Sequence, residues 1–405
     1  MATVDYPLID HGAVDRLRSQ PLDWQYKGLP PGIGSLADLV GRRVPVDGFT
    51  SPVAILDGPA LADNLDRYAA FCAERGLEFA PHVKTTMAPA LAAEQARRGA
   101  WAFTVANVAQ ARVLRAFGAR RLLLAHEVID PASLDWIVAE QEHAEIYCWV
   151  DSREGVAALD ARATAAGRSV GVFVELGLPG GRTGARGVPA ATDVARAVEK
   201  AAGLRLAGVA GYEATYGTGR SADSVAAVRR HLDELVRLAE VVDAETVTAG
   251  GSLYPDLVAE SFAGLAGARR AVLRSGAYLA HDDLRYASLS PFELRPALRV
   301  WATVVSAPEP GLAFLNMGKR DVSYDMGLPV PVAVLGPGGQ RPAERLEITA
   351  LNDQHAYLSD PGGEVAIGDW VACGISHPCT TFERWRALPV VDSDGHVTDL
   401  VRTFF

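Results

Sequence analysis

LEFAPHVKTTMAPALAAEQARRG, residues 77–99, contains a strand-like segment followed directly by a helix-like one. The first part, LEFAPHVK, is short and largely apolar, which is typical of a buried strand. The part that begins at Met87 has its apolar residues at helical spacing and ends at Gly99, a common helix terminator. The stretch therefore predicts one strand–helix unit with Lys84 at the end of its strand.

The same alternation repeats along the middle of the chain. Apolar strands that alternate with helices are typical of a parallel sheet covered on both faces. Eight such units over about 210 residues match the length of a (β/α)₈ TIM-type barrel. A doubly wound open sheet is the alternative that repeat counting leaves open. The eight expected strands begin at Leu77, Trp101, Arg121, Glu145, Val170, Leu206, Glu245 and Ala271.

The sequences on either side of the barrel region differ from it. One further strand–helix unit, SPVAILDGPALADNLDRYAAFCAERG, starts at Ser51. From about Leu294 the helical rhythm stops, and short β-rich runs are separated by Gly and Pro. We therefore expect a barrel domain over residues 51–290 and a smaller all-β domain made of residues 1–50 together with 291–405.

Composition restricts the class of protein. The chain has 405 residues, of which 49% are hydrophobic and 22% charged, as is ordinary for a globular protein of two domains. The net charge of −10 argues against nucleic acid and anionic membranes as partners. No apolar run suits a membrane span, no secretory signal is visible, and the 4 cysteines form no disulfide framework. The expected setting is the reducing cytoplasm.

Lys84 is the first candidate functional residue. In a β/α barrel, functional groups lie at the carboxyl ends of the strands. A lysine there is partly desolvated, which favours its neutral, nucleophilic amine. The alternative is an ordinary surface lysine whose aliphatic stem lies along the strand end.

Two glycine-containing loops follow the seventh and eighth expected strands. Loops in these positions of a barrel commonly hold phosphate through backbone N–H groups, although glycines also simply mark turns. A lysine and a phosphate cradle on one barrel are what pyridoxal phosphate (PLP) requires. The candidate phosphate-binding residues are Gly250, Gly251 and Ser252 in TAGGSLYPD, and Gly276 and Tyr278 in LRSGAYLAHD.

A candidate metal pair lies near the end of the chain, in ACGISHPCTTFERWR (372–386). In an extended strand, His377 and Cys379 would share one face with Cys373. Imidazole and thiolate together suit Zn²⁺, and two protein ligands leave positions open for water and substrate. The alternative is a buried cysteine and a hydrogen-bonded histidine on a core strand. Cys373, Cys72 and Cys148 are expected to be core residues.

Taken together, these motifs resemble the D-serine dehydratase/D-threonine aldolase family, which are fold type III PLP enzymes related to alanine racemase. The resemblance runs from about Ser51 to Arg386 and is carried by TSPVAILD, PHVKT, ELGLPGGRTGARG, GYEA, TAGGS, RSGAY and SHPC. It implies that Lys84 binds PLP as a Schiff base and that the two glycine loops hold its phosphate. It also implies that Arg182 lies near the phenolic oxygen of the cofactor and Tyr212 beside its ring.

The resemblance further implies a homodimer and a small D-amino acid as substrate. The dehydratase branch has His and Cys at the metal pair, whereas the aldolase branch has His and Asp. Cys379 therefore favours a Zn²⁺-assisted dehydratase that converts a D-serine-like β-hydroxy-amino acid to an α-keto acid and ammonia. The alternative is aldol cleavage to glycine and an aldehyde, and a racemase or a non-catalytic PLP-binding protein are further alternatives.

This chain departs from the family pattern at several positions. Relatives commonly read PHVKTHK, where this chain has Thr86 and Met87, and GGRTGARG contains an additional Arg186. These departures leave the exact substrate open. His355, in LNDQHAYL, is interpreted as a residue that supports the site from outside or is merely structural.

Overall fold

The computed structural model describes residues 7–217, 219–265 and 267–405. The chain forms two compact units, each built from several separate segments. The first unit holds the described residues up to His11, then Arg67–Lys84 and Ala92–Gly276. The second unit holds Gly12–Asp66, Thr85–Leu91 and Ala277–Phe405. Residues 1–6 of the expected 1–50 segment lie outside the described residues.

The first unit contains eight parallel strands in the order β2-β10-β9-β8-β6-β5-β4-β3. An isolated parallel bridge between His82 and Thr104 connects the ends of this series. All eight expected strands are present, so the predicted barrel-type fold is confirmed. Their bounds are β2 (Glu78–Phe79), β3 (Phe103–Val105), β4 (Arg121–Glu127), β5 (Glu145–Val150), β6 (Val170–Gly177), β8 (Leu204–Gly211), β9 (Thr246–Ala249) and β10 (Arg270–Leu273), with a short β7 (Ala185–Arg186) beside β6.

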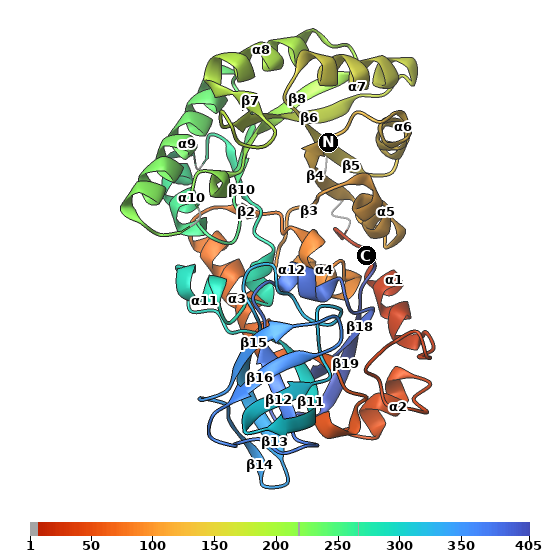
Figure 1. Cartoon of the computed structure of the whole chain (residues 1–405). Coiled ribbons are helices and arrows are strands. Elements are labelled where there is room, and N and C mark those ends of the chain that lie inside the picture. Colours follow the sequence, from red (N-terminus) through yellow and green to blue (C-terminus); the bar gives the residue numbers. More distant parts are fainter. Residues whose placement is uncertain (1–6, 218, 266) are drawn as a thin grey trace. The chain divides into compact units, whose positions relative to one another are not determined.

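Helices form the outer layer of this unit, and Figure 1 shows them around the strands. The inside of the barrel is a packed apolar core, as is usual for the fold. Trp149 and Phe173 pack in it as a tilted pair with ring centroids 4.8 Å apart, and Leu123 and Val272 contribute from β4 and β10. The helices are α4 (Pro89–Arg97), α5 (Val108–Ala116), α6 (Pro131–Glu140), α7 (Arg153–Ala165), α8 (Gly187–Lys200), α9 (Ala222–Val241) and α10 (Pro255–Phe262).

Local sequence explains where several of these helices begin. Asn107, Asp130, Ser152 and Ser221 each precede a helix, and each side chain accepts a hydrogen bond from the backbone N–H three residues later. Such N-caps satisfy amide groups that the first turn of a helix leaves without partners. Each cap lies in a loop that follows a strand, so it fixes the point at which the chain turns into its helix.

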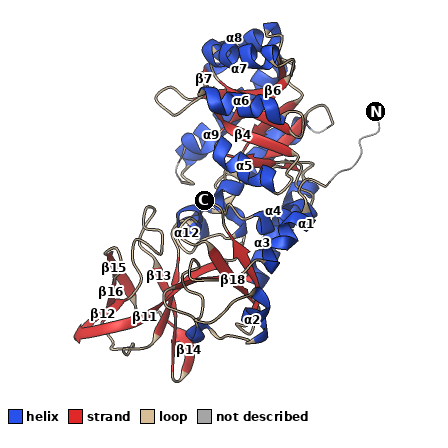
Figure 2. Ribbon diagram, turned by 90° about the vertical axis from the view of Figure 1, so that its right-hand side faces the viewer, coloured by secondary structure: helices blue, strands red, loops and turns tan. Residues whose placement is uncertain are grey.

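The second unit is mostly β-structure, as Figure 2 shows. One path through its sheet runs β14-β13-β17-β11-β1-β18-β19, and β12, β15 and β16 attach beside it. The N-terminal segment from Leu22 to Phe49 shares a hydrophobic core with Trp301 and Trp370 of this sheet. The strands are β1 (Val53–Asp57), β11 (Leu298–Glu309), β12 (Gly311–Leu315), β13 (Val330–Gly336), β14 (Gly339–Pro342), β15 (Glu347–Leu351), β16 (Ala356–Asp360), β17 (Trp370–Gly374), β18 (Ala387–Val391) and β19 (Val397–Arg402).

The boundary of the barrel differs from the expected range 51–290. β1 is assigned by sequence to the barrel domain, yet it pairs antiparallel with β11 and parallel with β18 in the second unit. Its local pattern is that of a buried strand, and only its long-range pairing reveals its sheet. The remaining helices are α1 (His11–Asp15), α2 (Leu36–Gly41), α3 (Gly58–Glu74), α11 (Arg285–Leu289) and α12 (Pro378–Phe382). Among the described residues, no helix has both the length and the apolar character needed to cross a membrane.

His231 gives the first unit a predictable sensitivity to acid. Its ring stacks on Tyr216 with centroids 4.0 Å apart, and neither ring nitrogen has a hydrogen-bond partner within the described part of the chain. Burial lowers its pKa from 6.5 to about 4. The unfolded chain therefore binds a proton that the folded chain does not, and stability is lost as pH falls from 6.5 toward 4. Over that window His231 should cost on the order of 3 kcal/mol of unfolding free energy.

This expectation is checked by comparing unfolding of the wild type and His231→Leu across pH 4 to 7. The variant should show a shallower loss of stability in acid, because only the wild type carries the buried imidazole. Parallel pH profiles for the two proteins would contradict the assignment.

Candidate functional site

The predicted cofactor residues of the first unit all follow the carboxyl ends of barrel strands. Lys84 lies in a 3₁₀ turn (Val83–Thr85) shortly after β2, and Arg182 lies in the loop after β6. Tyr212 comes directly after β8, and Gly250–Ser252 come directly after β9. Because parallel barrel strands all point the same way, these residues lie at the same end of the barrel.

A group of positive charges surrounds His82 at this end of the barrel. The pKa of His82 is held well below its usual value by burial first, and then by the charges of Lys84, Arg274 and Arg182. The Nδ1 atom of His82 is buried and has no hydrogen-bond partner among the described residues. A neutral histidine within three cations marks an electropositive region that suits an anionic ligand.

Arg274 is the buried member of this group, and sequence reasoning missed it. Its guanidinium donates to Thr248 Oγ1 at 2.8 Å and to the carbonyl oxygen of Gly211 at 2.7 Å. Burial lowers its pKa to about 10, although the carboxylates of Glu213 and Glu175 act in the opposite direction. A charged residue that directly follows the apolar run AVL was a visible signal, because such a position falls at a barrel's functional end.

Glu213 is a second residue that sequence reasoning missed. Its fully buried carboxylate accepts hydrogen bonds from the backbone N–H of Gly250 at 2.9 Å and of Gly251 at 2.8 Å. Burial raises its pKa, while these two hydrogen bonds oppose the rise. The two amides that the sequence assigns to phosphate are thus engaged by a carboxylate in this structure, which differs from the expectation.

The glycine loop after β9 requires its glycines. Gly250 has a φ of +113°, and a Cβ atom there would lie 2.3 Å from the side chain of Leu273. Ser275 Oγ donates to the carbonyl oxygen of Gly251 at 2.6 Å and itself receives a short hydrogen bond from the hydroxyl of Tyr68. The predicted loops after β9 and β10 are therefore joined through Ser275. Gly276 ends the first unit, and Tyr278 lies buried in the 3₁₀ turn Ala277–Leu279 of the second.

Arg182 and Tyr212 contact each other. The Arg182 guanidinium lies 4.5 Å from the centre of the Tyr212 ring, and its nearest approach to the buried Glu175 carboxylate is 4.0 Å. The additional Arg186 donates to the carbonyl oxygen of Arg182 at 2.6 Å and to that of Gly184 at 2.6 Å. Arg186 thus orders the loop that presents Arg182.

The metal pair of the second unit is formed differently from the prediction. β17 ends at Gly374, His377 is the N-cap residue of α12, and Cys379 lies in the first turn of that helix. The expected extended strand through these residues is wrong, because Pro378 starts a helix at its N1 position. The strand-to-helix turn still brings the two side chains together, since a hydrogen bond to Cys379 contributes to the pKa of His377.

Asp325 contacts the pair from a loop about fifty residues earlier in the chain. Its Oδ2 lies 2.6 Å from His377 Nδ1, and its Oδ1 accepts from Thr380 Oγ1 at 2.8 Å. Burial lowers the pKa of His377, but hydrogen bonds and charge from Cys379 and Asp325 outweigh it and raise the pKa to about 9. For Asp325, burial would raise the pKa, yet the hydrogen bonds from His377 and Thr380 hold it below its usual value.

Cys379 differs from the other three cysteines. Cys72, Cys148 and Cys373 are buried, as expected for core residues, and burial raises the pKa of each thiol to about 12. Cys379 is partly exposed, and its Sγ lies 3.4 Å from the hydroxyl of Thr85. Thr85 is the residue that follows Lys84 in the chain.

The other positions singled out by sequence differ in burial. Thr86 and Met87 are buried, and the carbonyl oxygen of Met87 accepts from the N–H of Phe404 at 2.9 Å. His355 is exposed in the turn between β15 and β16. In the described part of the chain, one group offers three possible metal-ligand atoms within 4.8 Å: Asp392, Asp394 and His396 in the turn between β18 and β19.

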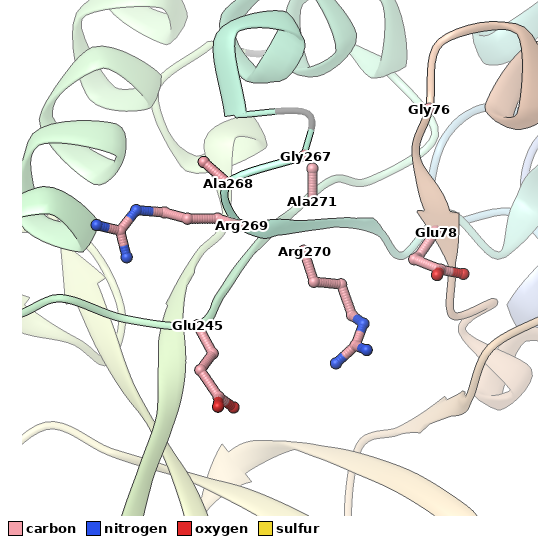
Figure 3. Close-up of a pocket in the computed structure, with 8 residues that line it drawn as sticks. All are labelled: Gly76, Glu78, Glu245, Gly267, Ala268, Arg269, Arg270 and Ala271. Atoms are coloured by element: carbon pink, nitrogen blue, oxygen red, sulfur yellow. The ribbon is translucent and has the colours of Figure 1, made fainter. Parts of the chain in front are cut away.

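A cavity of about 560 Å³ opens at the opposite end of the barrel strands. It lies at the amino ends of β2, β9 and β10, and Figure 3 shows Glu78, Glu245 and Arg270 around it. Because barrel active sites lie at the carboxyl ends of the strands, this cavity is not the candidate site.

Models of two protein families match separate parts of this chain. Residues 56–253 match the alanine racemase N-terminal domain, and residues 297–391 match the putative serine dehydratase domain. The chain is 26% identical to a D-threonine aldolase from Arthrobacter sp., over 88% of this chain and 92% of the relative. It is 25% identical to a 3-hydroxy-D-aspartate aldolase from Paracoccus denitrificans (79% and 82%) and 26% identical to a D-threo-3-hydroxyaspartate dehydratase from Delftia sp. (86% and 95%).

Solved structures show the same fold. The D-threonine aldolase from Filomicrobium marinum superposes with a TM-score of 0.78 at 24% identity, over 89% of this chain and 96% of the other. The D-threo-3-hydroxyaspartate dehydratase from Delftia sp. gives a TM-score of 0.77 at 22% identity, over 89% and 99%. The barrel and the β-unit together define a fold type III PLP enzyme. The chain belongs to that family, with an alanine racemase-type N-terminal domain and a serine dehydratase-type C-terminal domain, and is an enzyme of the lyase class.

Proposed function

We propose that this chain is a PLP- and metal-dependent lyase of D-β-hydroxy-amino acids, and that its reaction is dehydration to an α-keto acid and ammonia. The observation that carries the proposal is the partly exposed His377–Cys379 pair, held by Asp325, on a chain that also presents Lys84 at the end of an alanine racemase-type barrel. The curated relatives named above act on D-amino acids with a β-hydroxyl group, as aldolases or as a dehydratase.

The residues of the first unit fit PLP. Lys84, Arg182 and Arg274 supply positive charge for an anionic cofactor, and Tyr212 offers an aromatic face beside Arg182. A Cβ on Gly251 would come within 3.1 Å of the Tyr212 ring, so glycine keeps this space open. We assign phosphate to the first-unit residues Gly250–Ser252 and Gly276, although the amides of Gly250 and Gly251 bind the Glu213 carboxylate in this structure. When bound, PLP supplies an electron sink for charge that develops at the substrate Cα.

The residues of the second unit fit a borderline-soft divalent metal. Imidazole and thiol lie within hydrogen-bond reach of each other, and the pair is neither buried nor fully exposed. Zn²⁺ prefers this donor set, and a site with two protein ligands leaves coordination positions open. At such a site, the ion supplies Lewis acidity to a substrate β-hydroxyl, which is otherwise a poor leaving group.

The chain's own residues have distinct roles in the proposed reaction. The Lys84 amine would act as the general base that takes the Cα proton of the substrate. Arg182 and Tyr212 orient the cofactor, and Arg186 holds Arg182 in place. The overall reaction removes the Cα hydrogen and the β-hydroxyl as water, and water then hydrolyses the released enamine to keto acid and ammonia.

Aldol cleavage is the second candidate, because two of the curated relatives are aldolases. In that reaction the Cα–Cβ bond breaks instead, and the products are glycine and an aldehyde. We take Cys379 to favour dehydration. A cysteine-to-alanine variant of a D-threo-3-hydroxyaspartate dehydratase has been solved in a metal-free form, so the dehydratase has a cysteine that was replaced and a metal that can be removed.

The test is product analysis with D-serine, D-threonine and D-threo-3-hydroxyaspartate. The protein, loaded with PLP and Zn²⁺, should form keto acid and ammonia in equal amounts from at least one of the three. Glycine without keto acid would replace the dehydratase assignment with the aldolase one.

A further inference from the structure

The carboxylate of Asp325 is placed to control how His377 presents its ring. Oδ2 is 2.6 Å from Nδ1 of the imidazole, and Oδ1 accepts from Thr380 Oγ1 at 2.8 Å. One carboxylate oxygen therefore contacts the N-cap residue of α12 and the other contacts a residue within the helix, on either side of Cys379 in sequence. With Nδ1 donating to Asp325, the lone pair of a neutral His377 lies on Nε2.

Several hydrogen bonds fix the segment that carries Asp325. Ser323 Oγ accepts from the backbone N–H of His377 at 3.1 Å, and the N–H of Ser323 donates to Thr381 Oγ1 at 3.2 Å. The Ser323 and Ser376 hydroxyls lie 3.2 Å apart. Asp325 itself forms a backbone bridge with Gly327. The carboxylate is thus held on a segment that is bound to the turn bearing the pair.

We propose that Asp325 is a positioning residue for the metal, acting through His377, an inference that rests on the metal role proposed for His377 and Cys379. A histidine ligand commonly donates its second ring N–H to a carboxylate, which fixes the tautomer and raises the basicity of the ligating nitrogen. Asp325 supplies that carboxylate here. Thr380 holds the carboxylate from its other oxygen, so that it cannot turn away from the ring.

The competing interpretation is that Asp325 only stabilises the turn. Its side chain is 39% exposed, and an ion pair of that exposure contributes little to folding. A purely structural Asp325 would change the stability of the metal-free protein and leave metal affinity unchanged. The two roles therefore separate in a binding measurement that needs no turnover.

The experiment measures the Zn²⁺ affinity of the PLP-loaded protein by competition with a chromophoric chelator. The variants are Asp325→Ala and Asp325→Asn, with the exposed Asp353→Asn as the matched control in the same unit. Asp325→Ala should weaken Zn²⁺ binding about 10- to 100-fold. Asp325→Asn keeps an acceptor oxygen but no charge, so it should lose less, and Asp353→Asn should bind as the wild type does.

The outcomes separate this inference from the proposed function. If the wild type binds Zn²⁺ and both Asp325 variants bind it equally tightly, the positioning role is wrong and the metal site stands. If the wild type binds no divalent metal, the metal part of the proposed function is wrong, and this inference fails with it. Thermal midpoints of the metal-free proteins identify any variant that has not folded. If Asp325→Ala does not fold, the nearly isosteric Asp325→Asn still allows the Zn²⁺ affinities of variant and wild type to be compared.

Discussion

Lys84→Ala is expected to remove turnover, by at least about 1,000-fold, because the change deletes both the covalent attachment of the cofactor and the proposed base. The first unit would keep its fold, since Lys84 is exposed and follows the end of β2 rather than packing in the barrel core. The measurement is the rate of keto acid formation, together with the visible absorbance of the lysine-bound cofactor.

Lys200→Ala is the matched control for this change. Lys200 is an exposed lysine in the last turn of α8 in the same unit, so its loss should leave rate and absorbance unchanged. Borohydride reduction followed by peptide mapping should find the cofactor on the peptide that contains Lys84. Cofactor bound to another lysine, or full turnover by Lys84→Ala, would refute the assignment.

His377→Ala and Cys379→Ala are each expected to lower bound Zn²⁺ to a small fraction of the wild-type content. Turnover should fall by roughly 100-fold or more, since Lewis acid assistance to a leaving hydroxyl is worth several kcal/mol. Chelation of the wild type should have the same effect, and added Zn²⁺ should restore only the wild type. Metal analysis of the purified proteins and the rate of substrate loss are the readouts.

Cys373→Ala is the control for the cysteine change. Cys373 is fully buried in β17 and lies outside the contacts of His377, so its variant should retain the metal even where it lowers stability. Equal metal content in Cys379→Ala and the wild type would show that Cys379 is a structural residue and not a metal ligand.

The barrel could be predicted from sequence because each of its strands is a local signal. VGVFVELG is buried along most of β6, which ends at Gly177. β1 shows the limit of this reasoning. Val53–Asp57 has the same local pattern, but its partners β11 and β18 lie hundreds of residues away, and pairing at that distance leaves no trace in a short window.

The candidate site was predicted by two routes. The alternation of strands and helices placed Lys84 at a strand end, whereas Arg182 and Tyr212 were named only through the family resemblance; all three follow barrel strands in the structure. The local structure at His377 and Cys379 was predicted wrongly as an extended strand. A strand and the start of a helix both bring the two side chains close together, and Pro378 at the helix start is what favours the helix. Asp325 carries no local signal, since its role exists only through the folding of a distant loop against α12.

Product analysis with D-threo-3-hydroxyaspartate tests the central claim most directly, because curated relatives convert a 3-hydroxyaspartate by either reaction. The wild type loaded with PLP and Zn²⁺ is predicted to consume the D-isomer and release a keto acid and ammonia in equal amounts. Recovery of the amino acid with only its Cα configuration inverted, or no consumption of it, of D-serine or of D-threonine, would contradict the assignment as a D-β-hydroxy-amino acid lyase.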